Sequence, residues 1–218
     1  MGKERLTWGL SCVIKRERGG ILKYSNKKIM KNQKELLEQN QKNIEELLKN
    51  KSKVCAIIGQ KLITTPKDLY AHVESALNTL IYIHGYRIFL FGKSNEFEKM
   101  CIQILNKYQD LFPDIKKIFV VPFETYLDNG RLPLDICTRD FDEKIYLNSL
   151  AETRELSFLN RNYGMLVYSS FALMYAAAVE RSYAYYSLNF CLKHQIPFAN
   201  LYEFEEDEEL QRQTGFFD

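Results

Sequence analysis

The chain has 218 residues, of which 46% are hydrophobic and 13% aromatic, enough to bury one sizeable core, and its formal net charge is +2. No run of eighteen apolar residues occurs, so the sequence predicts no membrane-spanning segment. The five cysteines form no CxxC pair and the three histidines show no metal-ligand spacing. These features predict a protein of a reducing, cytoplasmic compartment, and we expect neither a metal nor a cofactor.

Charge is unevenly distributed along the chain. Residues 1–53 hold 14 Lys and Arg against 6 Asp and Glu, a balance of +8, whereas residues 54–218 carry a balance of −6. A basic front on an acidic body is typical of a solvated surface, or of a contact with nucleic acid or an acidic partner. We favour the solvated surface and keep nucleic acid as the weaker alternative.

The N-terminal region, residues 1–52, predicts a β-hairpin followed by a long basic helix. Thr7–Ile14 and Ile21–Tyr24 flank a glycine-containing turn, and Lys27–Asn50 follows with helical periodicity. The apolar positions of the helix form a narrow stripe: Ile29, Met30, Leu36, Leu37, Ile44, Leu47 and Leu48. We expect this stripe to pack on the protein's own sheet domain, with a homo-oligomer seam or a protein partner as the alternative.

Residues 53–203 alternate short apolar runs with amphipathic segments, and residues 204–218 form an acidic tail. Residues 123–147 are predicted to be mostly a long loop. The predicted strands are Val54–Ile58, Arg87–Phe91, Lys117–Pro122, Met165–Ser169 and Pro197–Tyr202, and the predicted helices begin at Thr65, Glu96, Glu152 and Glu180. The alternation predicts an α/β fold, a Rossmann-like doubly wound, mainly parallel sheet with helices on both faces.

Ligands of such sheets bind beyond the carboxyl ends of the strands. There the sequence places a strand, Gly92, a short polar turn and a helix that begins at Glu96. The backbone N–H groups of a helix start favour anions, so we interpret this turn as an anion site, with a plain strand–helix turn as the alternative. Three cations could pair with phosphate oxygens: Lys61, Lys93 and Arg154.

The segments VCAIIGQKLI and RIFLFGKSNEFEKMC resemble the SLOG superfamily, Rossmann-like nucleotide binders that include uncharacterised Firmicute and phage proteins. The resemblance covers about residues 53–202, and it is carried by Gly59, Gly92, Ser94, Glu96, Phe97 and Cys101. Arg154 falls near an Arg-Asn pair of the family, with Glu155 in place of the Asn. The resemblance implies a nucleotide-derived ligand contacted by Gly59, Gln60, Lys61, Gly92, Lys93, Ser94, Glu96, Arg154 and Ser182.

The sequence departs from the family at the last helix, where Ser182-Tyr183-Ala184 replaces Ser-Gly-Thr, and it lacks the glycine-rich signature of LOG phosphoribohydrolases. It contains no GxSxG, HExxH or P-loop, so we assign no catalytic residue. We expect non-enzymatic binding of a nucleotide or nucleotide-derived signal. One alternative is an interaction protein that lost the ligand and uses the basic helix and the surface FALMYAAAVERSYAYYSL. The other is a LOG-type phosphoribohydrolase with a decayed motif.

Overall fold

The computed structural model describes residues 22–60, 67–92, 95–123, 140–147, 154–177 and 182–202, with only the backbone for residues 22–33, 154 and 155. The chain forms two compact units, residues 1–37 and 38–218. Helix α1 (Leu22–Lys49) runs through the boundary between them, and a single 3-10 turn, η1 (Lys51–Lys53), leads from it into the first strand. None of the helices described is long and apolar enough to cross a membrane.

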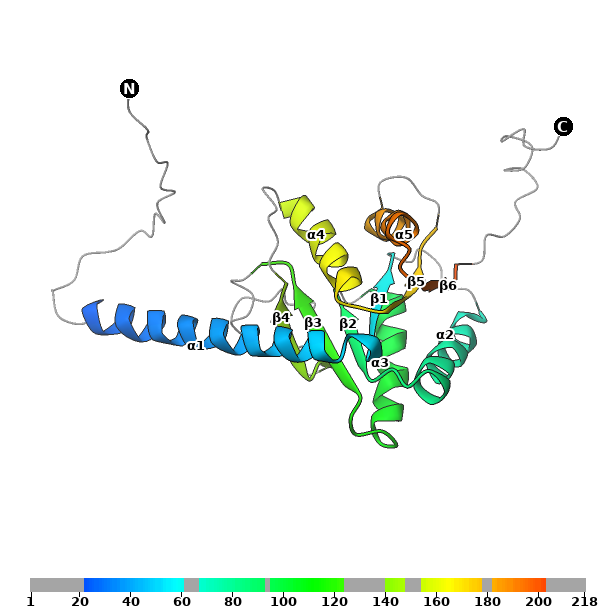
Figure 1. Ribbon diagram of the computed structural model, residues 1–218, viewed down its shortest axis with the longest axis horizontal. Coiled ribbons are helices and arrows are strands. Elements are labelled where there is room, and N and C mark those ends of the chain that lie inside the picture. The colour runs from blue at the N-terminus through cyan, green and yellow to red at the C-terminus, as the bar shows by residue number, and fades with distance from the viewer. Residues whose placement is uncertain are drawn as a thin grey trace, which may run out of the picture. The chain divides into compact units, whose positions relative to one another are not determined.

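A six-stranded, entirely parallel sheet forms the centre of the second unit (Figure 1). Its spatial order is β4-β3-β2-β1-β5-β6. The strands are β1 (Val54–Gly59), β2 (Ile88–Phe91), β3 (Lys116–Val121), β4 (Glu143–Tyr146), β5 (Phe171–Tyr175) and β6 (Phe198–Asn200). The chain moves outward from β1 to β4 and then returns to the free side of β1, so the strand order reverses between β1 and β5. The predicted doubly wound α/β class is confirmed.

Helices cover both faces of this sheet (Figure 1). One face carries α2 (Leu69–Asn78), the π-helical turn η2 (Thr79–Ile83) and α3 (Glu96–Gln109). The other face carries α4 (Arg154–Val167), α5 (Tyr183–His194) and the last turns of α1.

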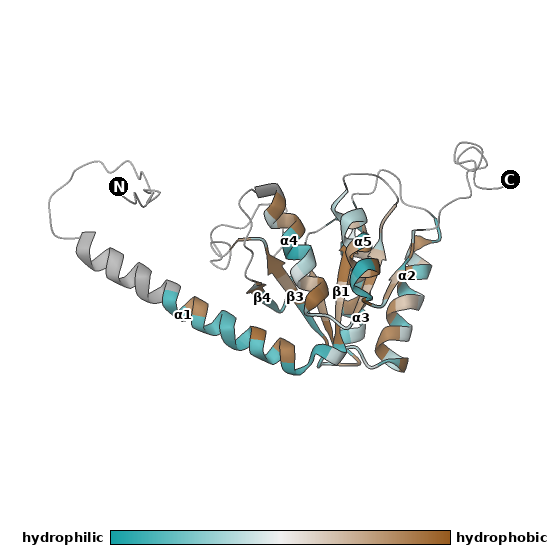
Figure 2. Cartoon of the chain, turned by 45° about the horizontal axis from the view of Figure 1, so that its top comes forward, coloured by the Kyte–Doolittle hydropathy of each residue, from teal (hydrophilic) through white to brown (hydrophobic). Residues whose placement is uncertain are grey.

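Side chains along β1 point alternately to the two faces of the sheet. Cys55 and Ile57 join the core under α2 and α3, and Val54, Ala56 and Ile58 join the core under α4 and α5. Because both faces are buried, the central strands consist of apolar residues throughout, as their brown colour in Figure 2 shows.

One predicted strand is wrong. Met165–Ser169, predicted as the fourth strand, lies in the last turn of α4 and the turn after it, and the strand is Phe171–Tyr175. A short apolar run such as GMLVY fits a buried helix as well as a buried strand, so periodicity alone does not distinguish them. The segment FALMY, considered above as a partner surface, instead fills the centre of the sheet, where Leu173 and Met174 are fully buried.

Two further predictions differ from the structure. Glu143–Tyr146, within the predicted loop 123–147, forms the edge strand β4, which was missed because only Ile145 of its four residues is buried. Leu22–Tyr24, predicted to belong to the second hairpin strand, is helical in α1. The first hairpin strand, the helix start at Thr65 and the acidic tail lie outside the described residues.

The last turns of α1 pack on the sheet. Leu47 is buried and Ile44 packs beside it, which confirms the predicted packing for these two residues, whereas Leu36, Leu37 and Leu48 are exposed. The Asn40 amide accepts a hydrogen bond from Tyr146 N–H (2.8 Å) and donates one to Tyr146 O (3.0 Å). The Asn40 side chain therefore satisfies the two backbone groups of Tyr146 that a neighbouring strand would otherwise bind. It covers part of the β4 edge of the sheet.

Candidate functional site

The carboxyl ends of β1, β5 and β6 are joined by hydrogen bonds where the strand order reverses. Gln60 N–H donates to Tyr175 O (3.0 Å), and Gln60 Oε1 accepts from Ala177 N–H (2.9 Å). Asn200 accepts from Ala176 N–H and donates to Ala176 O, both at 2.9 Å. The side-chain amide oxygen of Gln60, a predicted ligand residue, therefore accepts a hydrogen bond from the backbone that follows β5.

Helix α3 is tied to the end of β1 by its cap residue, Asn95. Asn95 Oδ1 accepts from Glu98 N–H (2.9 Å), and Asn95 Nδ2 donates to Gly59 O (2.8 Å). A Cβ atom on Gly59 would lie 2.7 Å from Cδ1 of Phe97, so only glycine allows α3 to approach this closely. Gly59 thus has a packing role, while Glu96 is exposed at the first residue of α3.

Gly92 ends β2 next to the guanidinium of Arg161, which projects from α4. A Cβ atom on Gly92 would lie 2.7 Å from Cζ, Nε and Nη2 of Arg161. The arginine is only 5% exposed, and its Nε and Nη2 donate to Asn162 Oδ1 at 3.3 and 3.0 Å. No ion pair joins Arg161 to any carboxylate in the part of the chain that the structure describes. A guanidinium with five N–H donors is therefore buried against one amide oxygen.

Burial lowers the pKa of Arg161 to about 10, because removing a cation from water disfavours its charged form. Electrostatic interaction with the Glu98 carboxylate, and to a smaller extent with Tyr183, raises the pKa of Arg161, so both residues lie close enough to influence the guanidinium. The pKa remains well above neutrality, and Arg161 is charged at pH 7. A desolvated cation without an ion pair favours the arrival of an anion.

Aromatic rings surround this guanidinium. Cζ of Arg161 lies 5.4 Å from the ring centroid of Phe158. The Phe158 ring stacks on Tyr183 at 6.4 Å with an interplanar angle of 25° and meets the ring of Phe123 edge-on at 6.2 Å. These rings come from α4, from α5 and from the turn that follows β3, so three elements converge beside Arg161.

A relay of hydrogen bonds connects Arg161 to the first turn of α5. Asn162 Nδ2 donates to Ser187 Oγ (3.2 Å), and the Ser187 hydroxyl donates to Tyr183 O (2.7 Å). Ser182 Oγ caps the same helix by accepting from Tyr185 N–H (3.0 Å). The relay fixes the direction of the guanidinium relative to the start of α5.

The structure describes five of the predicted site residues in full and leaves the side chains of the other four outside the described part of the chain. Gly59, Gln60, Gly92, Glu96 and Ser182 all lie at the ends of strands or the starts of helices that meet the carboxyl edge. Lys61, Lys93 and Ser94 lie outside the described residues, as does the side chain of Arg154.

The sequence prediction missed four buried or half-buried residues: Glu98, Phe158, Arg161 and Asn162. One signal was present in the sequence: an Arg-Asn pair at positions 161 and 162 stands two turns along the same helix from Arg154, the residue predicted to bind the ligand.

A cavity of about 480 Å³ lies elsewhere, between α2–η2 and the β5–β6 side of the sheet. Its walls are mostly apolar, with Leu80, Tyr86, Phe171 and Leu173 among them, and His72 on α2 also lines it. Neither Arg161 nor any of the aromatic side chains beside it lines this cavity. No group of three metal-ligating side chains occurs among the residues that the structure describes.

The fold and the site define a class, a Rossmann-like α/β protein whose sheet has, at its carboxyl edge, a buried arginine with no ion pair among the described residues. No protein-family model matches the sequence, and no curated protein matches it.

Proposed function

We propose that this protein binds a nucleotide or a nucleotide-derived signal at the carboxyl edge of its sheet, with Arg161 receiving the phosphate. The observation that carries the proposal is the buried guanidinium beside Gly92, which has one hydrogen-bond acceptor and no ion pair in the described residues. An isolated buried cation costs folding free energy, and a bound anion would offset that cost.

The chemistry of the edge favours a phosphate. A guanidinium presents paired N–H donors that match two phosphate oxygens, and it stays charged at neutral pH. The edge also lies where the strand order reverses, which is the usual ligand position in open parallel sheets. The helices α3 and α5 begin there, and a helix start favours negative charge. This function agrees with the one implied by the SLOG resemblance.

We assign binding without catalysis, in a reducing compartment such as the cytoplasm. Cys55, Cys101 and Cys191 are free and buried, which supports that compartment. Hydrolysis of a nucleotide to base and ribose phosphate needs a carboxylate positioned at the glycosidic bond. Among the described residues of this edge the buried carboxylate is Glu98, which lies in the first turn of α3 and accepts a hydrogen bond from Nδ2 of the cap residue Asn95 (3.3 Å). We expect purified protein incubated with AMP, CMP, GMP and UMP to release no free base, and release above a boiled control would restore the phosphoribohydrolase alternative.

One observation favours the alternative of an interaction protein that has lost its ligand. Gln60 and Asn200 join the strand ends with their own amides, so part of the edge is filled by the chain itself.

Native mass spectrometry separates the two readings. After incubation with the four mononucleotides, wild-type protein should carry a phosphate-containing adduct that Arg161→Gln lacks. An exposed cation at the far end of α5 provides the matched control, and Lys193→Gln should keep the adduct. The proposal would be contradicted if the wild-type protein carried no adduct, or if the adduct persisted in Arg161→Gln.

A further inference from the structure

Three side chains lie together at the start of α5: the Arg161 guanidinium, the Phe158 ring and the Tyr183 ring. Phe158 contacts both of the others, with the guanidinium 5.4 Å from its centroid and the Tyr183 ring stacked at 6.4 Å. The edge of Phe123 packs against Phe158 at 80°, which supports this ring from a further direction. These side chains therefore bring a cation and a stacked aromatic pair together in one place.

Tyr183 is the member of this group that is open to solvent. Tyr183 is 41% exposed, although it is the first residue of a helix whose neighbouring Ala184 is buried. Ser182 caps the helix, and Ser187 binds the carbonyl oxygen of Tyr183, so the backbone that carries the ring is held on both sides. A rigidly held, partly exposed aromatic ring loses little conformational entropy when it binds another flat surface.

We propose that Tyr183, supported by Phe158, is a stacking platform for the base of the nucleotide whose phosphate Arg161 receives. The proposal rests on the proposed function, since it needs the phosphate at Arg161. Every nucleobase has a π-face, and stacking on an aromatic side chain adds affinity without demanding one particular base. Tyr183 therefore gives the site selectivity for a base-bearing phosphate over a bare sugar phosphate. In this proposal Tyr183, which aligns with a glycine of the SLOG family, contacts the base of the ligand.

Calorimetric titration of AMP and of ribose 5-phosphate tests the platform, because the two probes differ only by the base. Wild-type protein should bind AMP about tenfold more tightly than ribose 5-phosphate. Tyr183→Leu should reduce that ratio to below about threefold, whereas Tyr183→Phe should keep it, since the ring remains. Tyr186→Leu is the matched control, because Tyr186 is a 37% exposed tyrosine of the same helix that contacts Tyr185 at 6.1 Å instead of Phe158. This control should keep the wild-type ratio.

The outcomes distinguish this inference from the function on which it rests. Equal affinity for both probes in the wild type, with both weakened by Arg161→Gln, would overturn the platform while the phosphate site stands. An AMP preference that survives in Tyr183→Leu would also overturn it. If neither probe binds, the proposed function fails, and the platform fails with it.

Discussion

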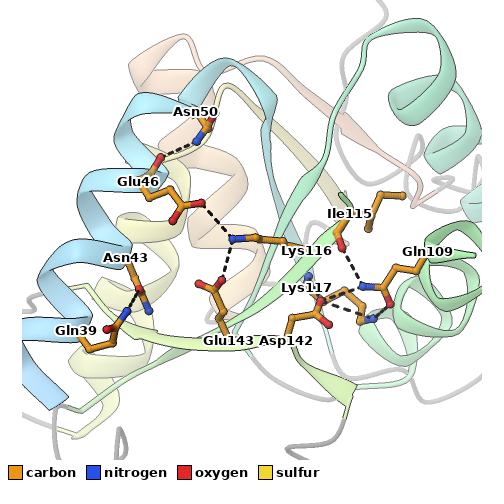
Figure 3. Close-up of polar contacts among 10 residues, drawn as sticks. All are labelled: Gln39, Asn43, Glu46, Asn50, Gln109, Ile115, Lys116, Lys117, Asp142 and Glu143. Atoms are coloured by element: carbon orange, nitrogen blue, oxygen red, sulfur yellow. Dashed lines mark hydrogen bonds and ion pairs between the residues drawn. The ribbon is translucent and has the colours of Figure 1, made fainter. Parts of the chain in front are cut away.

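Lys117 and Arg161 are both buried cations, 4% and 5% exposed, but their surroundings differ. Lys117 lies at the amino end of β3, where its Nζ donates to Gln109 Oε1 and stands 3.8 Å from Asp142 Oδ2 (Figure 3). The same carboxylate oxygen accepts from Lys117 N–H (2.7 Å) and from Gln109 Nε2 (3.1 Å). Arg161 lies at the opposite, carboxyl edge and has only Asn162 Oδ1 as an acceptor among the described residues.

The difference separates a structural charge from one that is available to a ligand. Burial lowers the pKa of Lys117, and the charge of Asp142 opposes that change from within the fold. The neighbouring Lys116 likewise bridges Glu46 (3.1 Å) and Glu143 (2.9 Å), which links α1 to β4 (Figure 3). The amino edge thus pairs its buried cation with a carboxylate, whereas Arg161 at the carboxyl edge has no ion pair among the described residues and only the more distant charge of Glu98 acting on it.

The largest expected effect comes from removing the partner of the satisfied cation. Asp142→Ala should lower the free energy of unfolding by about 3 kcal/mol, because Lys117 would then be buried without a carboxylate. Asp114→Ala is the control, since the cation of that ion pair, Arg87, is only half-buried and Asp114 is largely exposed, so the pair should contribute under about 0.5 kcal/mol. Urea denaturation measures both, and equal losses would show that the burial of Lys117 makes no difference.

The two glycines of the carboxyl edge should respond differently to the same substitution. A Cβ on Gly59 meets the core ring of Phe97, so Gly59→Ala should cost about 2 kcal/mol of stability. A Cβ on Gly92 meets the end of the flexible Arg161 side chain, which can move, so Gly92→Ala should cost under about 1 kcal/mol. Gly92→Ala should instead weaken anion binding by displacing the guanidinium. Thermal denaturation compares the pair, and a larger loss in Gly92→Ala would show that Arg161 cannot move.

Arg161→Met should raise the free energy of unfolding by about 1 kcal/mol, because an apolar side chain replaces a desolvated charge that no ion pair from the described residues compensates. Denaturation in the absence of added nucleotide is the measurement. A loss of about 2 kcal/mol or more would instead place Arg161 with Lys117 as a structural charge, and the contrast between the two edges would fail.

The smallest effect on stability is expected from Asn162→Asp, which gives Arg161 the carboxylate that Lys117 already has. The new ion pair offsets the desolvation of the added charge, so stability should change by less than about 1 kcal/mol. Affinity for a phosphate-bearing probe should fall, since the guanidinium is neutralised from within. Unchanged affinity for AMP in this variant would show that Arg161 does not receive the phosphate.

Much of the fold was predictable because strands buried on both faces of a sheet consist of apolar residues throughout, and such runs are visible in the sequence. The runs at Val54–Ile58 and Arg87–Phe91 are apolar throughout and end in glycine, so strand, turn and helix follow in order. It was not predictable that FALMY forms the strand β5 while GMLVY belongs to the end of α4. The two are adjacent apolar runs, and only tertiary packing decides which one pairs with β1.

The candidate site was predictable in position but not in its central residue. The alternation of strands and helices identifies the carboxyl edge, and therefore Gly59 and Gly92, whereas Ser182 was predicted from the family resemblance alone. Arginine in a helix is usually solvated, so nothing in the local sequence marks Arg161 as buried. Its burial follows from the absence of a side chain on Gly92, which comes from a different strand.

The most direct test follows the Arg161 Nε–H resonance by nuclear magnetic resonance during titration with AMP, GMP, CMP and UMP. The signal is assigned by its disappearance in Arg161→Met. A guanidinium that receives a phosphate forms charge-assisted hydrogen bonds, so the resonance should shift saturably with at least one nucleotide. A resonance that stays in place at saturating concentrations of all four nucleotides would contradict the assignment of Arg161 as the phosphate-binding residue.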